Sequence, residues 1–562
     1  MWFSSKTSLS VPEAETEYGK ISGKLFILPD GKITNVFLGI PFAKPPINEL
    51  RFEKPQPPEP WDGILQTKKY KCRSIQKDFI WDLLELKVLN SEDCLYLNIM
   101  TPEKVENKKY PVMIYIHGGG FVMDSAVKYH YSKICRNIVS KDVIFVTIQY
   151  RLGYLGFLTT NDETALGNYG MWDQLMAIKF IKNNIANFNG DPENITLLGQ
   201  SAGGVAVDLL SISPHSRDLF SKIILMAGNA ETMWSISPRC KVAKNCQRKA
   251  IQLGFIKPTA GLKWTKEDNE AMLKFLKNVP ANTLGLTMVG STNIFDSIQL
   301  PLTPVIDGDF LPKCLTELRK ESPKKLIIAG NCEFEGLLFL ALGLKSIDRH
   351  LFEGVKHRAS MIILEGNKLI DENLQTSIKI FEKIYSLNDQ NMARKEMEKT
   401  VVRVSATHGS EINTLFDINI FVSPHFRTIN DRKVTDIIST LFTNFAKCGN
   451  PNEFPSPILF DFDWEPIKSE ISQKCLSINV EPKMEEIVDN SKCMNAAFSA
   501  IQTWMTKATE EEYMEFMQRT KSTQPAKIKW LFIVWQTIQK AYNVIVYCTQ
   551  SFSSYNKNKK HV

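Results

Sequence analysis

The chain has 562 residues, of which 43% are hydrophobic and 23% are charged, the usual balance for a globular protein with a sizeable core. Its formal net charge of +7 comes from basic residues scattered along the sequence, so the charge does not indicate a nucleic-acid partner. The 11 cysteines are spread over the whole chain, unlike the dense disulfide framework of a small secreted domain.

The two ends of the chain bear on where the protein works. No apolar run of signal-peptide length follows Met1, so we expect a cytoplasmic protein whose cysteines are mostly reduced. Residues 530–548 are apolar in parts, but Gln536, Gln539, Lys540 and Asn543 interrupt them, and a spanning helix needs about 20 largely apolar residues. We therefore expect an amphipathic helix that docks on the protein body or associates peripherally with an intracellular membrane.

Short apolar runs alternate with helical patterns along the chain. The apolar runs predict strands, buried on both faces, at residues 112–116, 143–148, 195–198, 223–226 and 326–328. Helical spacing of apolar residues predicts helices over residues 172–185, 367–386, 432–447 and 509–520. The alternation predicts an α/β fold with a large, mainly parallel central sheet flanked by helices. Strand-like pieces at residues 36–38 and 95–97 favour an antiparallel edge.

No linker, internal repeat or low-complexity segment divides the chain. We therefore predict an N-terminal extension over residues 1–20 and a single large domain over residues 21–520. The amphipathic helix and a basic tail would then occupy residues 521–562.

The strongest chemical signal lies at residues 195–204, where an apolar run ends in Gly-Gln-Ser-Ala-Gly-Gly. A strand, a sharp turn and a helix pattern form the setting of a nucleophile elbow, which strains the serine backbone and exposes its oxygen. Gly199 and Gly203 are needed because a side chain there would collide with the crossing helix and strand. The pattern predicts that Ser201 is a nucleophile at a helix N-terminus, where negative charge is favoured.

A second signal, His-Gly-Gly-Gly-Phe at residues 117–121, directly follows a predicted strand. Attack on an ester creates an oxyanion, which needs backbone N–H donors about 3 Å away. We predict that Gly119, Gly120 and the N–H of Ala202 form this oxyanion hole. A phosphate-binding loop is the alternative, but no Lys-Ser or Lys-Thr follows the glycines.

These motifs resemble those of the type-B carboxylesterase and cholinesterase family, most closely the insect alpha-esterases. The resemblance runs from about residue 14 to residue 480 and includes the segments 39–46, 50–52, 91–98, 150–153, 167–170, 173–174, 444–446 and 449–451. It implies the α/β-hydrolase fold, small-molecule carboxylic esters as substrates, and no metal or cofactor.

The resemblance also implies the remaining site residues. Glu335 stands at the family's position for the triad acid, with Asp348 and Glu333 as weaker candidates, and His408 matches the family's histidine loop. His350, His357 and His425 lie in less suitable contexts. The implied pocket residues are Trp234, Phe121 and Gln200, although a core role is the alternative for the tryptophan. Cys72 and Cys94 match the family's first disulfide, and we expect them to be reduced or only partly paired.

Three departures from the family pattern bear on activity. Gln200 replaces the usual Glu before the serine, which removes a carboxylate that would stabilise the protonated histidine. Glu335 and His408 are only 73 residues apart (408 − 335), an interval shorter than the family's by several tens. Asn189 replaces a usual Gly, a mild change because Asn tolerates a left-handed backbone.

The sequence thus predicts a serine carboxylic-ester hydrolase that acts through an acyl-enzyme and whose activity is reduced by these departures. Two alternatives stay open. One is a catalytically impaired esterase-like protein that serves in ligand binding, sequestration or adhesion. The other is a lipase that works at a membrane interface through the C-terminal helix.

Overall fold

The computed structural model describes residues 10–78, 88–232, 234–287, 300–332, 410–416, 429–453 and 474–486, together with residues 463–464, 466, 511–512 and 515. The predicted helix 367–386, most of the predicted helix 509–520 and the C-terminal segment 521–562 lie outside the described residues. Among those described, no helix combines the length and hydropathy that a membrane span requires.

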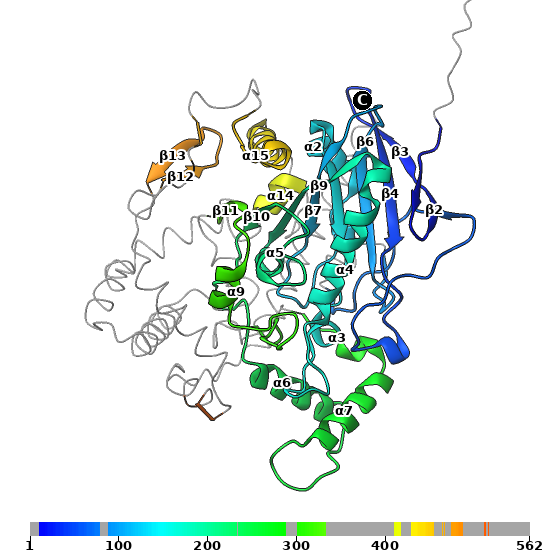
Figure 1. Cartoon of the computed structure of the whole chain (residues 1–562), viewed down its shortest axis with the longest axis vertical. Coiled ribbons are helices and arrows are strands. Elements are labelled where there is room, and N and C mark those ends of the chain that lie inside the picture. The colour runs from blue at the N-terminus through cyan, green and yellow to red at the C-terminus, as the bar shows by residue number, and fades with distance from the viewer. Residues whose placement is uncertain are drawn as a thin grey trace, which may run out of the picture.

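A large twisted sheet forms the centre of the molecule (Figure 1). Its order in the described chain is β11-β10-β9-β7-β8-β6-β4-β3. The strands β7 to β11 pair in parallel, whereas β6, β4 and β3 pair antiparallel along the other edge. Their bounds are β3 (Lys24–Ile27), β4 (Ile33–Pro41), β6 (Tyr96–Pro102), β7 (Tyr110–Ile116), β8 (Ile144–Ile148), β9 (Gly190–Gln200), β10 (Lys222–Met226) and β11 (Leu326–Gly330). The predicted parallel sheet with an antiparallel edge is confirmed.

Two small sheets accompany the central one. The first has the order β1-β2-β5, with β1 (Glu13–Thr16), β2 (Gly19–Ser22) and β5 (Ile64–Gln66). The second is the antiparallel pair β12 (Lys474–Ser477) and β13 (Lys483–Glu486). The strand β1 and half of β2 therefore lie within the N-terminal segment 1–20. β1 pairs with β2, and β2 pairs with β5 of the main body.

Helices cover both faces of the central sheet (Figure 1). The α-helices are α2 (Tyr131–Asn137), α3 (Gly153–Phe157), α4 (Tyr169–Asn184), α5 (Ala202–Ile212), α6 (Arg239–Gln252), α7 (Lys266–Asn278), α9 (Leu315–Glu321), α14 (Ser410–Phe416) and α15 (Ile429–Cys448). Short 3₁₀ helices are η1 (Asn48–Leu50), η2 (Ala126–Lys128), η3 (Val139–Lys141), η4 (Ile185–Phe188) and η5 (Ala281–Leu284). The helices predicted over 172–185 and 432–447 correspond to α4 and α15.

Alternate residues of the inner strands supply two hydrophobic cores. On β7, Ile114 packs into the core that includes α4 and α5, and its neighbour Tyr115 packs into the core that includes α14 and α15. This alternation explains the unbroken apolar runs, because both faces of the inner strands are covered. The prediction of two-sided burial is wrong for β11, where Leu326 is 53% and Ile327 is 50% exposed. The reason is position, since β11 is the edge of the described sheet.

A buried ion pair fixes the loop after β8 to α4. The guanidinium of Arg151 donates to both carboxylate oxygens of Asp173 at 2.7 and 2.8 Å, and the Arg151 backbone N–H donates at 3.0 Å. The two side chains are only 3% and 0% exposed. Bidentate geometry offsets much of the cost of taking both charges out of water.

We predict that Asp173→Ala lowers the free energy of unfolding by about 3–5 kcal/mol, because it leaves a buried guanidinium without its carboxylate. Urea titration checks this value, with the exposed pair Lys108–Asp142 as the control site. There Asp142→Asn should cost about 0–1 kcal/mol. Equal losses at the two sites would contradict the assigned role of Asp173.

Candidate active site

Ser201 occupies the sharp turn between β9 and α5. Its backbone has φ 55° and ψ −125°, a combination that residues other than glycine rarely adopt. The Ser201 N–H donates to the carbonyl of Met226 at 2.8 Å, and the Ser201 carbonyl accepts the N–H of Val205 at 3.0 Å. The serine is 8% exposed, at the first turn of α5. The predicted strand–turn–helix elbow is therefore present.

Glycines around the elbow allow three backbones to meet. A Cβ on Gly203 would lie 2.1 Å from the carbonyl oxygen of Ile116 at the end of β7. A Cβ on Gly199 would lie 2.3 Å from the backbone of Gly203, and one on Gly228 would lie 2.2 Å from the Ser201 carbonyl oxygen. The predicted steric need for glycine at positions 199 and 203 is confirmed.

The glycine turn after β7 runs alongside the serine. A Cβ on Gly118 would lie 3.1 Å from the Ser201 Cβ and 2.5 Å from the Gln200 carbonyl oxygen. Gly119 and Gly120 have φ values of 84° and 62°, which favour glycine. The structure thus brings the two sequence motifs together, although they are about 80 residues apart in the chain.

Two stacked rings support the glycine turn after β7. His117 is buried and lies 4.5 Å from Tyr150 between ring centroids, and the Tyr150 hydroxyl donates to the His117 carbonyl at 2.9 Å. Burial lowers the pKa of His117 below its usual value. The folded protein therefore favours the neutral imidazole, which holds the turn without adding a charge.

Two predicted pocket residues lie beside this turn. Gln200 is 3% exposed, and its side-chain oxygen would be 3.2 Å from a Cβ on Gly118. Phe121 is fully buried and packs on Phe157, with 5.1 Å between ring centroids. Gln200 thus faces the glycine turn, whereas the ring of Phe121 belongs to the core.

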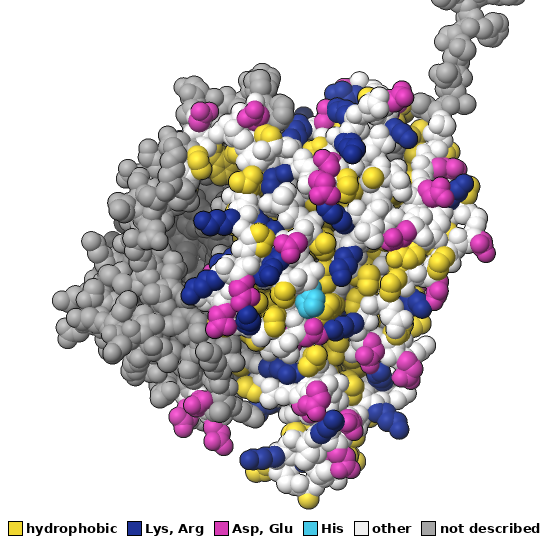
Figure 2. Space-filling view, viewed as in Figure 1, with side chains coloured by type: hydrophobic (Ala, Val, Ile, Leu, Met, Phe, Trp, Pro, Cys, Tyr) yellow, Lys and Arg dark blue, Asp and Glu magenta, His cyan; other side chains and the backbone are white. Residues whose placement is uncertain are grey.

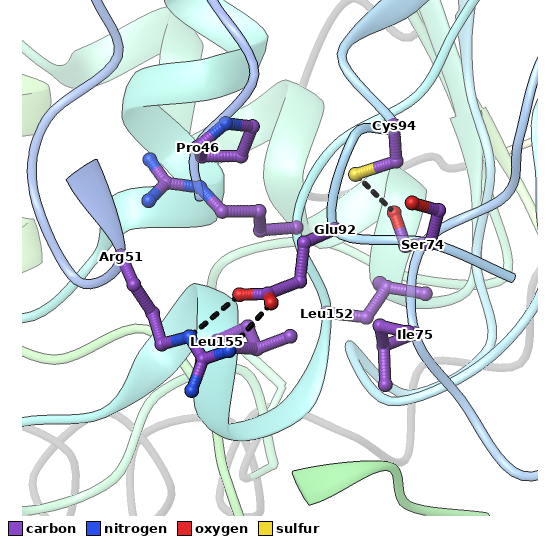
Figure 3. Close-up of a pocket in the computed structure, with 10 residues that line it drawn as sticks. Pro46, Arg51, Ser74, Ile75, Glu92, Cys94, Leu152 and Leu155 are labelled. Atoms are coloured by element: carbon purple, nitrogen blue, oxygen red, sulfur yellow. Dashed lines mark hydrogen bonds and ion pairs between the residues drawn. The ribbon is translucent and has the colours of Figure 1, made fainter. Parts of the chain in front are cut away.

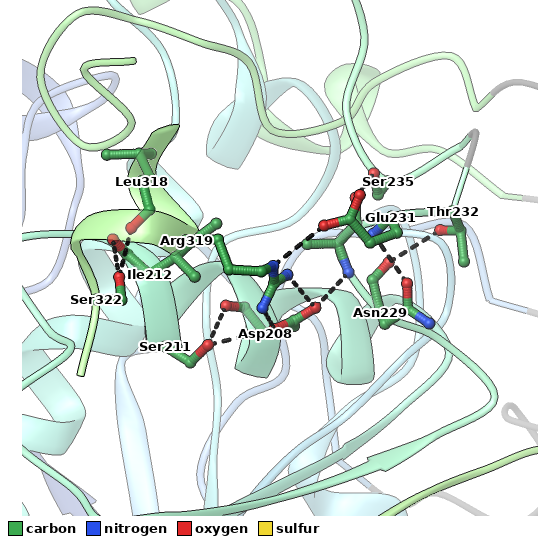
Figure 4. Close-up of polar contacts among 11 residues, drawn as sticks. Asp208, Ser211, Ile212, Asn229, Glu231, Thr232, Ser235, Leu318, Arg319 and Ser322 are labelled. Atoms are coloured by element: carbon green, nitrogen blue, oxygen red, sulfur yellow. Dashed lines mark hydrogen bonds and ion pairs between the residues drawn. The ribbon is translucent and has the colours of Figure 1, made fainter. Parts of the chain in front are cut away.

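A charged network holds the loop that leads to Trp234 (Figure 4). Asp208 on α5 accepts the backbone N–H of Ala230 at 2.8 Å and two bonds from Arg319 on α9 at 2.9 and 3.1 Å. Arg319 also donates to Glu231 at 3.1 Å. Because this loop begins at Gly228 against Ser201, the network joins the nucleophile helix to the predicted pocket side. Sequence reasoning missed it, since no local pattern pairs residues about 110 positions apart.

The carboxyl ends of β10 and β11 continue the same edge of the sheet. The N–H of Ala227 donates to the carbonyl of Gly330 at 2.8 Å, directly beside the strand end that holds Ser201. Glu335 follows five residues later, and both Glu335 and His408 lie outside the described residues. Their flanks are described, and they meet: the Cys332 thiol donates to the Glu411 carboxylate at 2.7 Å.

The helix that follows His408 is anchored firmly to the sheet. Phe416, at the end of α14, packs against Tyr115, Tyr129 and Phe145 with ring centroids 4.8, 4.9 and 5.7 Å away. The amide of Asn137 donates to the carbonyl of Leu415 at 3.0 Å. The described structure thus fixes the chain two residues beyond His408.

A separate pocket is lined by Arg51, Glu92 and Cys94, among others (Figure 3). Arg51 and Glu92 form an ion pair at 2.6 Å, and the Ser74 hydroxyl donates to the Cys94 sulfur at 3.3 Å. Burial raises the pKa of the Cys94 thiol to about 12, and neither Cys94 nor Cys72 forms a disulfide. The walls leave no space for a water molecule, so this pocket does not suit a substrate.

Other predicted features can be placed as well. Asn189 has φ 62° and ψ 22°, which confirms that it adopts the left-handed backbone expected at this position. Within the described part of the chain, no cluster of three or more His, Cys, Asp or Glu side chains could hold a metal ion.

The parallel sheet, the strained serine at the end of β9 and the adjacent glycine turn define an α/β-hydrolase. The sequence profile of the carboxylesterase family matches residues 10–404 and 358–496, and the chain belongs to this family.

Three relatives illustrate the similarity. The esterase cest-33 of Caenorhabditis elegans is 32% identical over 492 residues, which cover 79% of this chain and 86% of the relative. The pyrethroid hydrolase Ces2a of Mus musculus is 30% identical over 505 residues, which cover 80% of this chain and 86% of the relative. The juvenile hormone esterase of Tribolium castaneum is 43% identical over 226 residues, which cover 40% of this chain and 38% of the relative. Family and relatives support carboxylic-ester hydrolysis as the reaction.

We predict that Gly118→Ala lowers kcat/KM for an ester by about 10²-fold, because its Cβ forces the turn away from Ser201 and a displacement of about 1 Å has that effect. Steady-state kinetics on a p-nitrophenyl ester measure the loss. Gly330→Ala is the control, since its Cβ would meet open space. Full activity in Gly118→Ala would show that the turn does not act on the substrate.

We also predict that the unfolding free energy falls as the pH drops through the ordinary histidine pKa of about 6.5. The unfolded chain then binds a proton that buried His117 resists, so the folded state loses stability as the pH falls. His117→Asn removes this proton uptake on unfolding. It therefore reduces the slope of the unfolding free energy against pH, between pH 5 and pH 8, by up to about 1.4 kcal/mol per pH unit. Urea titrations of both proteins across that range decide the point, and identical slopes would contradict it.

Proposed function

We propose that the protein hydrolyses small-molecule carboxylic esters through an acyl-enzyme on Ser201, with His408 and Glu335 as its partners and without a metal or cofactor. The observation that carries this proposal is the contact between the two motifs. The strained Ser201 backbone lies directly beside the glycine turn, 3.1 Å from where a Gly118 Cβ would be.

The proposed reaction has two balanced halves. The Ser201 oxygen attacks the ester carbonyl carbon while His408 takes the hydroxyl proton. The bond to the alcohol then breaks, and His408 returns the proton to the leaving alcohol. Water repeats the sequence against the acyl-enzyme and releases the acid. Glu335 orients the imidazole and stabilises its protonated form.

In this proposal, three backbone N–H groups stabilise the negatively charged intermediate. Ala202 is the first residue of α5, so its N–H is one of those that a helix leaves without an intrahelical partner. Gly119 and Gly120 supply the others from the turn beside Ser201. Removal of one such donor typically costs about 2.7–4 kcal/mol of transition-state stabilisation.

The contact between Cys332 and Glu411 supports assembly of the triad despite the short interval. Cys332 lies three residues before Glu335, and Glu411 lies three residues after His408. Three residues of extended chain reach about 10 Å, so both triad candidates are tethered to one place at the edge of the sheet. The contact between Cys332 and Glu411 thus closes a loop around the segment that holds both candidates.

Gln200 sets the proposed activity below that of a relative with a carboxylate at this position. Its amide faces the glycine turn but carries no charge, so it cannot stabilise the imidazolium electrostatically. We expect slow turnover on an otherwise complete site. Trp234, partly buried against the core, would border the acyl side.

The second candidate function is an esterase-like protein that binds esters without turnover. One observation favours it: the family matches in two overlapping pieces, residues 10–404 and 358–496, so no single match contains both Ser201 and His408. Action at a membrane through the C-terminal helix is a further option. It predicts that lipid vesicles raise the activity and that removal of residues 525–562 abolishes the increase.

Hydrolysis of p-nitrophenyl acetate and butyrate by wild type, Ser201→Ala and His408→Ala tests the proposal. We predict that either variant loses at least 10³-fold in kcat, because nucleophile and base act as a unit. His215→Ala is the matched control, since this histidine lies on the surface beside Asp309. If wild type hydrolysed the esters no faster than both variants, the proposed hydrolysis would be contradicted and binding without turnover would be the remaining function.

A further inference from the structure

The α6–α7 hairpin (residues 239–278) projects from the body at the end opposite α15 (Figure 1). Its two helices pack together through buried side chains such as Val242, Cys246 and Met272. The loop between them forms the far tip. The catalytic proposal does not use this part of the molecule.

The hairpin is strongly basic. Its 40 residues contain ten Lys and Arg residues and three Asp and Glu residues, a net charge of +7 (10 − 3). Between Glu231 and Glu267 there is no acidic residue. Most Lys and Arg residues lie elsewhere in the chain, as expected from their scatter, but this segment has a local excess. Asp268 pairs with Lys257 and Glu163 pairs with Lys266.

Large apolar side chains project from the tip of this basic hairpin. Leu262 is 99% and Ile256 is 86% exposed, the two highest values among the large apolar side chains that the structure describes, and Ile251 at the end of α6 is 54% exposed. Figure 2 shows hydrophobic side chains at the lowest point of the molecule, with basic and acidic side chains above them. Apolar side chains that gather on an exposed surface indicate a contact site.

The tip is held in one shape from inside. Phe255 contacts Trp264 and Phe275 with ring centroids 5.9 and 5.6 Å away. The Lys257 ammonium donates to the carbonyls of Thr259 and Gly261 at 3.0 and 3.1 Å. The loop therefore presents its apolar side chains without ordering cost.

We infer that the tip of the α6–α7 hairpin docks on an anionic lipid bilayer. Ile256 and Leu262 enter the boundary between headgroups and acyl chains, and basic side chains such as Arg248 and Lys263 meet lipid phosphates. A convex, aliphatic tip fits a fluid interface. The phosphate backbone of a nucleic acid would offer its leucine and isoleucine nothing to contact. This surface is independent of the esterase reaction, which it would bring to a membrane.

Co-sedimentation of the full chain with phosphatidylcholine vesicles, with and without phosphatidylserine, tests the inference. We expect binding only to the anionic vesicles, weakened by added salt. Lys263→Glu should weaken binding at least about five-fold, the worth of one basic side chain near such a surface. Ile256→Asp with Leu262→Asp should weaken it further.

Ile429→Asp is the matched control, because Ile429 is 85% exposed but lies on α15. Binding that survives the tip variants but is lost on removal of residues 525–562 would overturn the inference. Equal binding to neutral vesicles, or no binding, would overturn it too. Ester hydrolysis in solution should stay unchanged in the tip variants, so this test and the test of catalysis fail independently.

Discussion

The strained backbone of Ser201 is the constraint on which the rest of the site depends. A non-glycine residue at φ 55° and ψ −125° costs about 1–3 kcal/mol and persists only when its surroundings fix it. Here the surroundings are the Met226 carbonyl and three glycines that let β7, α5 and the loop after β10 approach the turn within a backbone's width. The contacts that maintain this strain therefore hold Ser201, the glycine turn and the loop after β10 at one point.

The same point is connected to α14, which begins two residues after His408, by a continuous chain of contacts. The end of β11 leads to Cys332, which bonds to Glu411 on α14. Phe416 at the other end of α14 packs on Tyr129, whose hydroxyl donates at 2.7 Å to Asp124, just after the glycine turn. These contacts hold the described chain on either side of residues 333–409 at one edge of the sheet.

The sequence predicted the features that local patterns specify. Apolar runs predicted the inner strands, the elbow predicted the position of Ser201, and Asn189 was expected in its left-handed backbone. Contacts between distant residues, such as Cys332 with Glu411, left no local signal. The exposure of β11 depends on its place in the sheet rather than on its composition. The basic charge of the hairpin is present in the sequence, but the net charge of the whole chain does not reveal it. It becomes apparent only when charged residues are counted over that segment.

The central claim is that Ser201 is an activated nucleophile where these segments meet, and a fluorophosphonate probe tests it most directly. Wild-type protein should gain one phosphonyl group, which peptide mass spectrometry should locate on Ser201. Native His408→Ala should label far more slowly, because the base that removes the serine proton is gone. Absence of label from Ser201, or equal labelling rates in the two proteins, would contradict the account.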